Sequence, residues 1–159
     1  MSRILGLLII VFGFIACDND AVFDKYESLP NQWNKDSIIS FEVKYLDSLQ
    51  AYDLFINIRN TNDYPYSNLY LITSMNFPHG KVIEDTLEYQ MSKSDGEWLG
   101  VGVGEVKSSK LWYKKGVHFQ EEGNYTFKIR QAMRKNGERE GVENLKGITE
   151  VGLRIEKSN

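Results

Sequence analysis

Residues 52–59 of the chain read YDLFINIR, and this stretch indicates the fold class. Every second position is apolar, and polar side chains lie between most of the apolar ones. The apolar face holds Tyr52, Leu54, Ile56 and Ile58, and the polar positions are Asp53, Asn57 and Arg59. A period of two is typical of a β-strand with one face buried and the other facing water. The stretch therefore predicts a half-buried strand.

The same alternation recurs along the rest of the chain. It covers residues 41–45, 69–77, 87–91, 99–103, 125–129 and 151–155. Turn-forming residues separate these stretches, as in Pro78-His79-Gly80 and Lys135-Asn136-Gly137. Because no long helical pattern intervenes, we expect an all-β fold. The spacing predicts an antiparallel β-sandwich of seven to nine strands, immunoglobulin-like or jelly-roll-like, with a closed barrel as the alternative.

One short segment favours a sandwich more specifically. Residues 122–127 read EGNYTF, an acid-x-Gly-x-Tyr-like approach to a strand. In many sandwiches a tyrosine at this place bonds through its hydroxyl to backbone a few residues upstream. We therefore expect Tyr125 to form such a tyrosine corner.

The sequence before residue 38 divides into two parts. Residues 1–16 contain Arg3 and an apolar stretch from Ile4 to Ile15, which is too short to span a bilayer as a helix and has the layout of a signal peptide. Ala16 and the only cysteine, Cys17, follow it, so Phe14-Ile15-Ala16-Cys17 resembles a lipobox. We expect cleavage before Cys17 and acylation of its thiol, with several acyl chains holding the protein stably at a membrane. A plain signal peptide cut elsewhere is the alternative.

Residues 17–37 are predicted to form a tether between the acylated cysteine and a domain spanning residues 38–159. The spacing of its apolar residues permits a short helical turn, which Pro30 would interrupt. Docking of these side chains onto the domain is the expected role, and an exposed recognition segment is the alternative. The apolar positions are Val22, Phe23, Tyr26, Leu29 and Trp33.

Charge and cysteine content exclude some function classes. The net charge of −3 becomes −4 when Arg3 leaves with the signal peptide, which argues against a nucleic-acid partner. One cysteine cannot form an internal disulfide, so packing must supply the stability.

Residues that could carry catalysis are scarce. The two histidines, His79 and His118, are far apart in sequence, and no zinc-ligand spacing or Gly-x-Ser-x-Gly motif is present. The many carboxylates alternate with apolar residues or lie in turns, where solvated acids belong. We therefore expect no enzymatic activity, no cofactor and no metal.

Three glycines alternate with apolar residues at Gly100, Gly102 and Gly104. They lack the spacing of a dinucleotide-binding loop. They predict a strand face without side chains, which either Trp98 or Trp112 covers or which forms a flat docking groove.

Several segments together resemble one family. The tether VFDKY (22–26), the turn DYPYSNLY (63–70), and the stretches DTLEYQM (85–91), DGEWLG (95–100) and GITEVGL (147–153) are similar to gliding-motility lipoproteins of the GldH type from Bacteroidetes. The resemblance implies an envelope lipoprotein required for gliding over surfaces, placed with the outer-membrane machinery that gliding shares with type IX secretion. It implies no catalytic residues.

This resemblance leaves two roles open. The first is a scaffold or assembly component that contacts other gliding or secretion envelope proteins through a sheet edge or aromatic loops. Its candidate contact residues are Tyr64, Tyr66, Tyr70, Trp98 and Trp112. The alternative is a surface carbohydrate-binding lipoprotein that stacks sugars on Trp98 or Trp112.

The acidic residues after the cysteine bear on which face of the outer membrane carries the protein. Asp18 and Asp20 resemble the negatively charged export signals of surface lipoproteins in this group. Two acids are a short signal, and we expect the lipid to hold the protein at the periplasmic face.

Three tripeptides predict modification. Asp-Ser/Thr-aliphatic sequences resemble the O-glycosylation acceptors of exported Bacteroidetes proteins, and they place candidate acceptors at Ser37, Ser48 and Thr86.

Overall fold

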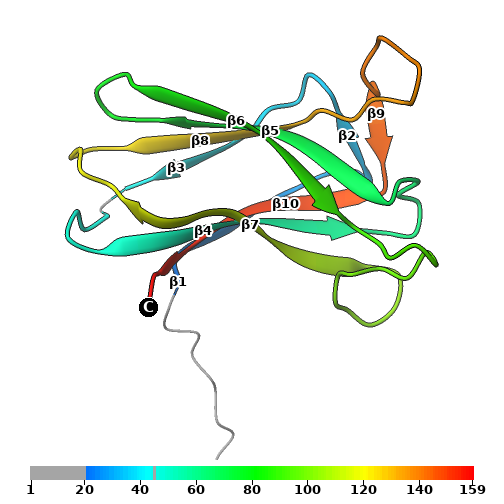
Figure 1. The fold of residues 1–159 in the computed structure, drawn as a ribbon, viewed down its shortest axis with the longest axis horizontal. Coiled ribbons are helices and arrows are strands. Elements are labelled where there is room, and N and C mark those ends of the chain that lie inside the picture. The colour runs from blue at the N-terminus through cyan, green and yellow to red at the C-terminus, as the bar shows by residue number, and fades with distance from the viewer. Residues whose placement is uncertain (1–20, 45) are drawn as a thin grey trace, which may run out of the picture.

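The computed structural model describes residues 21–44 and 46–159, and within them the chain forms ten β-strands (Figure 1). The strands are β1 (Ala21–Ser28), β2 (Gln32–Asn34), β3 (Ile39–Val43), β4 (Ala51–Asn60), β5 (Asn68–Asn76), β6 (Val82–Gln90), β7 (Lys107–His118), β8 (Tyr125–Gln131), β9 (Asn144–Lys146) and β10 (Ile148–Lys157). In the described part of the chain, no helix is long and apolar enough to cross a bilayer.

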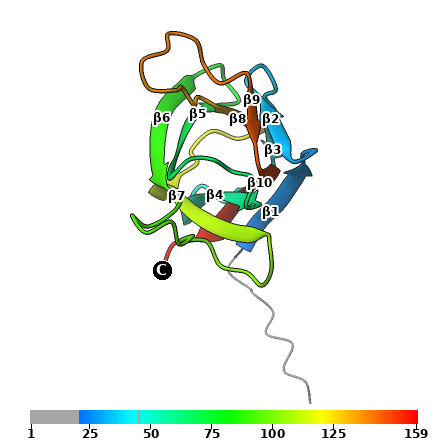
Figure 2. The same ribbon diagram turned by 90° about the vertical axis from the view of Figure 1, so that its right-hand side faces the viewer.

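The strands form two antiparallel sheets that pack face to face. Sheet A has the order β1-β10-β4-β7 and sheet C the order β3-β8-β5-β6, while β2 and β9 pair as a short ribbon at one end. Figures 1 and 2 show the two layers from the side and from one end. The two sheets remain separate, so the predicted sandwich is confirmed and the closed barrel is not formed.

The core lies between the two sheets and follows the predicted alternation. Leu54, Ile56 and Ile58 of β4 face inward and are completely buried, opposite residues such as Leu71 and Phe127 of sheet C. Each fully buried large side chain contributes roughly 1.5–3 kcal/mol to folding. The outward residues Phe55 and Asn57 are buried too, so other side chains must cover the outer face of sheet A at β4.

The structure differs from the predicted tether from residue 21 onward. Residues 21–28 form β1, an edge strand of sheet A that pairs with β10, and not the helical turn that the spacing permits. Phe23 packs edge-on against Phe41, with ring centroids 6.3 Å apart. Trp33 is fully buried, and its Nε1 donates to the Ser37 carbonyl at 2.9 Å. Phe23 and Trp33 therefore pack into the domain, where β1 adds an edge to sheet A and β2 pairs with β9.

The strand predicted at residues 99–103 is also wrong. This segment belongs to a loop before β7, and its only ladder contact is a single bridge between Val101 and Ser108. Apolar residues alternate with glycines here, so the segment has the period of a half-buried strand. The positions between the apolar residues hold glycine and not the polar side chains that such a strand places toward water. Atoms of Ser108 and Ser109 lie closest to Gly100, so Trp98 and Trp112 do not cover this glycine.

The tyrosine corner forms as predicted. The buried Tyr125 hydroxyl donates to the Glu121 carbonyl and accepts from the Glu121 backbone N–H, both at 3.0 Å. This pair of bonds fixes the connection from β7 into β8, which joins the two sheets.

Candidate functional site

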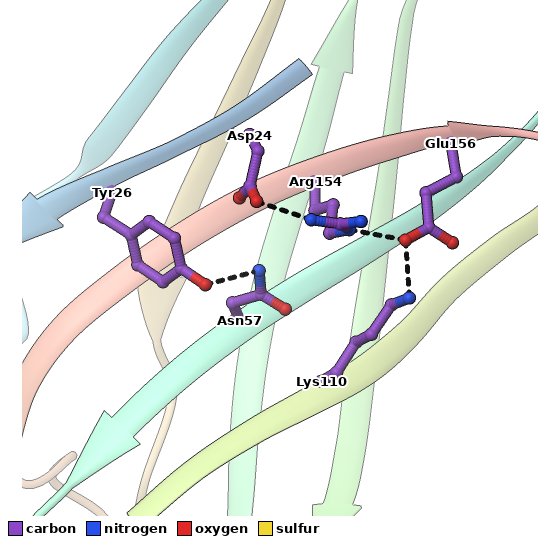
Figure 3. A network of polar contacts seen from close by, with 6 residues as sticks. All are labelled: Asp24, Tyr26, Asn57, Lys110, Arg154 and Glu156. Atoms are coloured by element: carbon purple, nitrogen blue, oxygen red, sulfur yellow. Dashed lines mark hydrogen bonds and ion pairs between the residues drawn. The ribbon is translucent and has the colours of Figure 1, made fainter. Parts of the chain in front are cut away.

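The outer face of sheet A carries a polar network that crosses all four of its strands. Figure 3 shows six of its side chains converging from β1, β4, β7 and β10. They are Asp24, Tyr26, Asn57, Lys110, Arg154 and Glu156. Because side chains alternate along each strand, residues at every second position of paired strands meet on this one face.

Arg154 lies at the centre of the charged part of the network. Its Nη1 is 2.6 Å from the Asp24 carboxylate, and its Nε donates to Glu156. Lys110 Nζ approaches the same Glu156 carboxylate at 2.6 Å. Burial alone would raise the pKa of Glu156, but hydrogen bonds from Lys110 and Arg154 outweigh it and lower that pKa. The side chains of Arg154 and Glu156 are only 13% and 16% exposed, so water screens these contacts less than ordinary surface ion pairs.

Tyr26 extends the network toward the strand β4. Asn57 Nδ2 donates to its hydroxyl at 2.9 Å, and the Arg59 guanidinium lies 4.8 Å from the centre of its ring. The ring rests on Gly152 of β10, where an added Cβ would come within 2.8 Å of it. Burial and the nearby Asp24 raise the pKa of the Tyr26 hydroxyl, which therefore remains protonated and neutral. Gly152 thus permits the close approach that brings β1 and β4 into contact across β10.

An aromatic and cationic cluster completes the face on β7. The Trp112 and Phe55 rings lie 4.4 Å apart, and Lys110 Nζ is 4.1 Å from the centre of the Phe55 ring. Lys115 Nζ lies 5.9 Å from the Trp112 ring. Trp112 is nonetheless 53% exposed, so it presents a large amphipathic ring at this surface.

A loop beside this face exposes aliphatic side chains. We call residues 99–106 the valine loop; its sequence is LGVGVGEV. Val101 is 75% exposed, Val103 is fully exposed, and Leu99 and Val106 are about half exposed. Val101 also borders a hollow of about 300 Å³ over Tyr26, Arg59 and Arg154. The loop therefore forms one wall of the outer face of sheet A.

The five predicted contact residues do not form one surface. Tyr64 is only 3% exposed and donates its hydroxyl to the Asn68 carbonyl at 2.6 Å, so it is a core residue. Tyr66 and Trp98 are partly buried against it, with ring centroids 5.9 and 6.1 Å from the Tyr64 ring. Burial raises the pKa of the Tyr64 hydroxyl well above its ordinary value, with a smaller contribution from Tyr66.

The other two candidates lie on opposite sides of the sandwich. Tyr70 is on β5 of sheet C, where it interacts with Glu88 of the neighbouring β6. Trp112 is on β7 at the edge of sheet A. Of these five aromatic residues, only Trp112 is largely exposed to solvent.

The three predicted glycosylation acceptors are all at the surface. Ser37, Ser48 and Thr86 are exposed, as modification of their hydroxyls would require. Ser48 lies beside a hollow of about 490 Å³ between residues 46–48 and 119–124. The predicted lipidation site Cys17 and the predicted signal peptide lie outside the described residues.

The histidines occupy separate surface positions. His79 Nδ1 lies 3.5 Å from the Glu121 carboxylate in a turn, and His118 is exposed at the end of β7. Within residues 21–44 and 46–159, no group of three or more His, Cys, Asp or Glu side chains is placed to hold a metal ion.

The network on sheet A was not found from the sequence, although two signals for it were present. Gly152 interrupts the alternation of β10 at a position where a side chain would block a neighbouring ring. Arg154 and Glu156 continue the same face as charged residues at a spacing of two. Tyr26 could not be joined to them because residues 21–28 were assigned to a tether.

Comparison with known proteins agrees with the resemblance described above. The profile of the family described as GldH lipoprotein matches residues 21–155. A gliding motility lipoprotein GldH homolog from Christiangramia forsetii is 56% identical over 162 residues, covering 100% of this chain and 99% of the relative. The gliding motility lipoprotein GldH of Flavobacterium johnsoniae is 45% identical over 153 residues, covering 96% of this chain and 95% of the relative. The chain therefore belongs to the GldH lipoprotein family.

Proposed function

We propose that this gliding-motility lipoprotein acts as a non-enzymatic scaffold or assembly component of the envelope machinery that gliding shares with type IX secretion. The observation that carries the proposal is the full-length relationship to proteins named as gliding motility lipoproteins, at 56% and 45% identity. The similarity covers 100% and 96% of the chain, so it includes the sandwich and most of the residues before it. The protein's relation to gliding is therefore not confined to a shared domain.

The proposed membrane attachment is the acylated Cys17. Ala21, where β1 begins, lies four residues after it, and four residues span at most about 14 Å. The sandwich is therefore held close to the lipid surface rather than on a long stalk. We place the anchor in the outer membrane, with its periplasmic face favoured over the cell surface.

The sandwich offers rigid surfaces suited to a scaffold. In the described part of the chain, the two four-stranded sheets end in the edge strands β1 and β7 and β3 and β6. The outer row of backbone groups on such a strand is free for pairing except where loop or side-chain groups reach it, as Val101 does at Ser108 of β7. A partner strand can add to such an edge, and exposed aromatic rings such as Trp112 supply side-chain contacts. Binding to other gliding or secretion envelope proteins accounts for these features without any catalytic group.

A test of the scaffold role combines cross-linking with purification from native membranes. Cells produce the protein with a C-terminal affinity tag, and the purified material is analysed for cross-linked envelope proteins. We expect specific adducts that a Trp112→Ala variant loses or weakens and a Tyr70→Ala variant, changed on the opposite sheet, retains. Recovery of the uncross-linked monomer alone from gliding cells would contradict the scaffold role.

The exposed Trp112 ring also supports the alternative of carbohydrate binding. A ring that is 53% exposed can stack on a sugar, whereas Trp98 is partly buried and donates to the Asn62 side chain at 3.1 Å. Binding of the purified protein to a glycan array, abolished by Trp112→Ala and retained by Trp98→Phe, would favour this role over the scaffold.

A further inference from the structure

Hydrogen bonds at its base fix the conformation of the valine loop, whose apolar side chains face water. The backbone groups of Val101 and Ser108 exchange hydrogen bonds of 2.8 and 2.7 Å, and Lys107 Nζ donates to the Gly102 carbonyl at 2.8 Å. These contacts fix the base of the loop on β7. Gly102 has a φ of +153° and lies against the Val106 carbonyl, so the loop closes tightly there. The tip, with Val103 fully exposed, is therefore a defined feature rather than a collapsed segment.

The valine loop projects on one particular side of the domain. In Figures 1 and 2 the loop before β7 extends past sheet A, away from sheet C. Val101 borders the hollow on the outer face of sheet A, which agrees with this placement. The exposed apolar tip and the exposed Trp112 therefore belong to the same side of the sandwich.

The beginning of β1 lies on the same sheet at its other end. Ala21 pairs with Glu156, which pairs with Asp53, whereas Lys107 at the base of the valine loop pairs with Asn60. Residue 53 lies near the start of β4 and residue 60 is its last residue, so sheet A separates the two features by most of the length of that strand. An anchor within about 14 Å of Ala21 holds one end of sheet A near the lipid. If the outer face of sheet A lies toward the bilayer, the valine loop reaches the lipid surface that holds the anchor.

The side chains between these ends are suited to an interface with lipid. Tryptophan is enriched where hydrocarbon meets headgroups, and lysines keep their stems in apolar surroundings while the ammonium group reaches water. Trp112, Lys110 and Lys115 provide this combination on β7. The charged groups of the network are largely paired with one another, through Asp24, Arg154 and Glu156, which reduces the cost of bringing this face close to a membrane.

We propose that the valine loop is a second membrane contact, which inserts Val101 and Val103 into the lipid surface and lays the outer face of sheet A against the bilayer. The inference rests on the proposed anchor at Cys17, since the anchor brings the loop within reach of the lipid. The ligand of the valine loop and the outer face of sheet A is phospholipid. Removing one valine side chain from water corresponds to roughly a tenfold change in an equilibrium, so two valines suffice to orient a domain that is already tethered.

The test uses the acylated protein, purified from membranes and reconstituted into vesicles of phosphatidylethanolamine with a minority of phosphatidylglycerol. Acylation consumes the only native thiol, so Val103→Cys and Val82→Cys each introduce a single site for an environment-sensitive fluorophore. Val82 is the matched control because it is a valine, 56% exposed, on β6 of sheet C. Neither side chain is buried, so both variants should fold like the wild type.

We expect the fluorophore at position 103 to shift to shorter wavelength on reconstitution and to react at least roughly tenfold more slowly with a water-soluble quencher than the fluorophore at position 82. Equal exposure at both positions, or protection at position 82 alone, would overturn the inference. Protection at position 103 in native envelopes but not in pure lipid vesicles would also overturn it, because a protein would then cover the loop. The wild type should take up no fluorophore; labelling at Cys17 would refute the proposed anchor as well, which separates the two failures.

Discussion

The contact between Tyr26 and Gly152 gives the sharpest prediction of stability. A Cβ added at Gly152 would lie 2.8 and 2.9 Å from two Tyr26 ring carbons and 3.0 Å from the Lys25 carbonyl. Gly152 does not have the left-handed backbone conformation that favours glycine, so its substitution by alanine acts through this contact. The ring must move away, and it then loses the hydrogen bond from Asn57, worth about 1 kcal/mol, and the cation–π contact with Arg59, worth about 0.5–1 kcal/mol.

The opposing effect of Gly152→Ala is small. Alanine restricts the unfolded chain and stabilises a compatible site by about 0.4–1 kcal/mol. We therefore expect Gly152→Ala to lower the free energy of unfolding by about 1 kcal/mol, measured by urea unfolding followed by near-ultraviolet circular dichroism. In a Tyr26→Ala background the same change should cost clearly less, because only the Lys25 carbonyl at 3.0 Å then remains close to the added Cβ. Gly141→Ala is the control, since its added Cβ meets only the Met133 carbonyl at an ordinary 3.5 Å. An equal loss with and without the Tyr26 ring would refute the reasoning.

Three further predictions concern the network and the tyrosine corner. Arg154→Met should lower the free energy of unfolding by about 1–3 kcal/mol because it removes the guanidinium that pairs with both Asp24 and Glu156 and leaves Glu156 with Lys110 alone. Lys93→Met at an exposed ion pair should change it by less than about 0.5 kcal/mol in the same urea titration. Tyr125→Phe should cost about 1 kcal/mol in thermal or urea unfolding, because the hydroxyl both donates to and accepts from the Glu121 backbone; no loss would show that the corner is not stabilising. The lowered pKa of Glu156 stabilises the folded state above the unfolded value of about 4.3, and this contribution disappears as the pH falls through the folded pKa. Glu156→Gln should therefore show a smaller loss of stability between neutral and acidic pH than the wild type, and identical pH profiles would contradict this role.

The sequence predicted the parts of the fold in which burial is one-sided. Strands such as β5 and β8 have a regular alternation because one face meets the core and the other meets water. Tyr125 was found because the corner depends on a local spacing of four residues, between Tyr125 and Glu121. Both signals are contained within a short stretch of chain, so a single sequence is enough to read them.

The missed features depend on contacts between distant segments. β1 is an edge strand with mostly exposed side chains, so its composition resembles that of a tether, and only its pairing with β10 makes it a strand. The valine loop has the alternation of a strand but pairs at only one bridge, between Val101 and Ser108, which is too little for a strand. Tyr64 was a candidate contact residue because it lies in a turn, yet the turn folds inward and buries the ring. In each case tertiary contacts decide the outcome.

Mass spectrometry of the N-terminal peptide from protein purified out of native membranes tests the membrane-anchored account most directly. The account predicts that the mature chain begins at Cys17, that residues 1–16 are absent, and that the cysteine carries the added mass of several acyl chains. A peptide that retains residues 1–16, or a Cys17 with a free thiol, would contradict it.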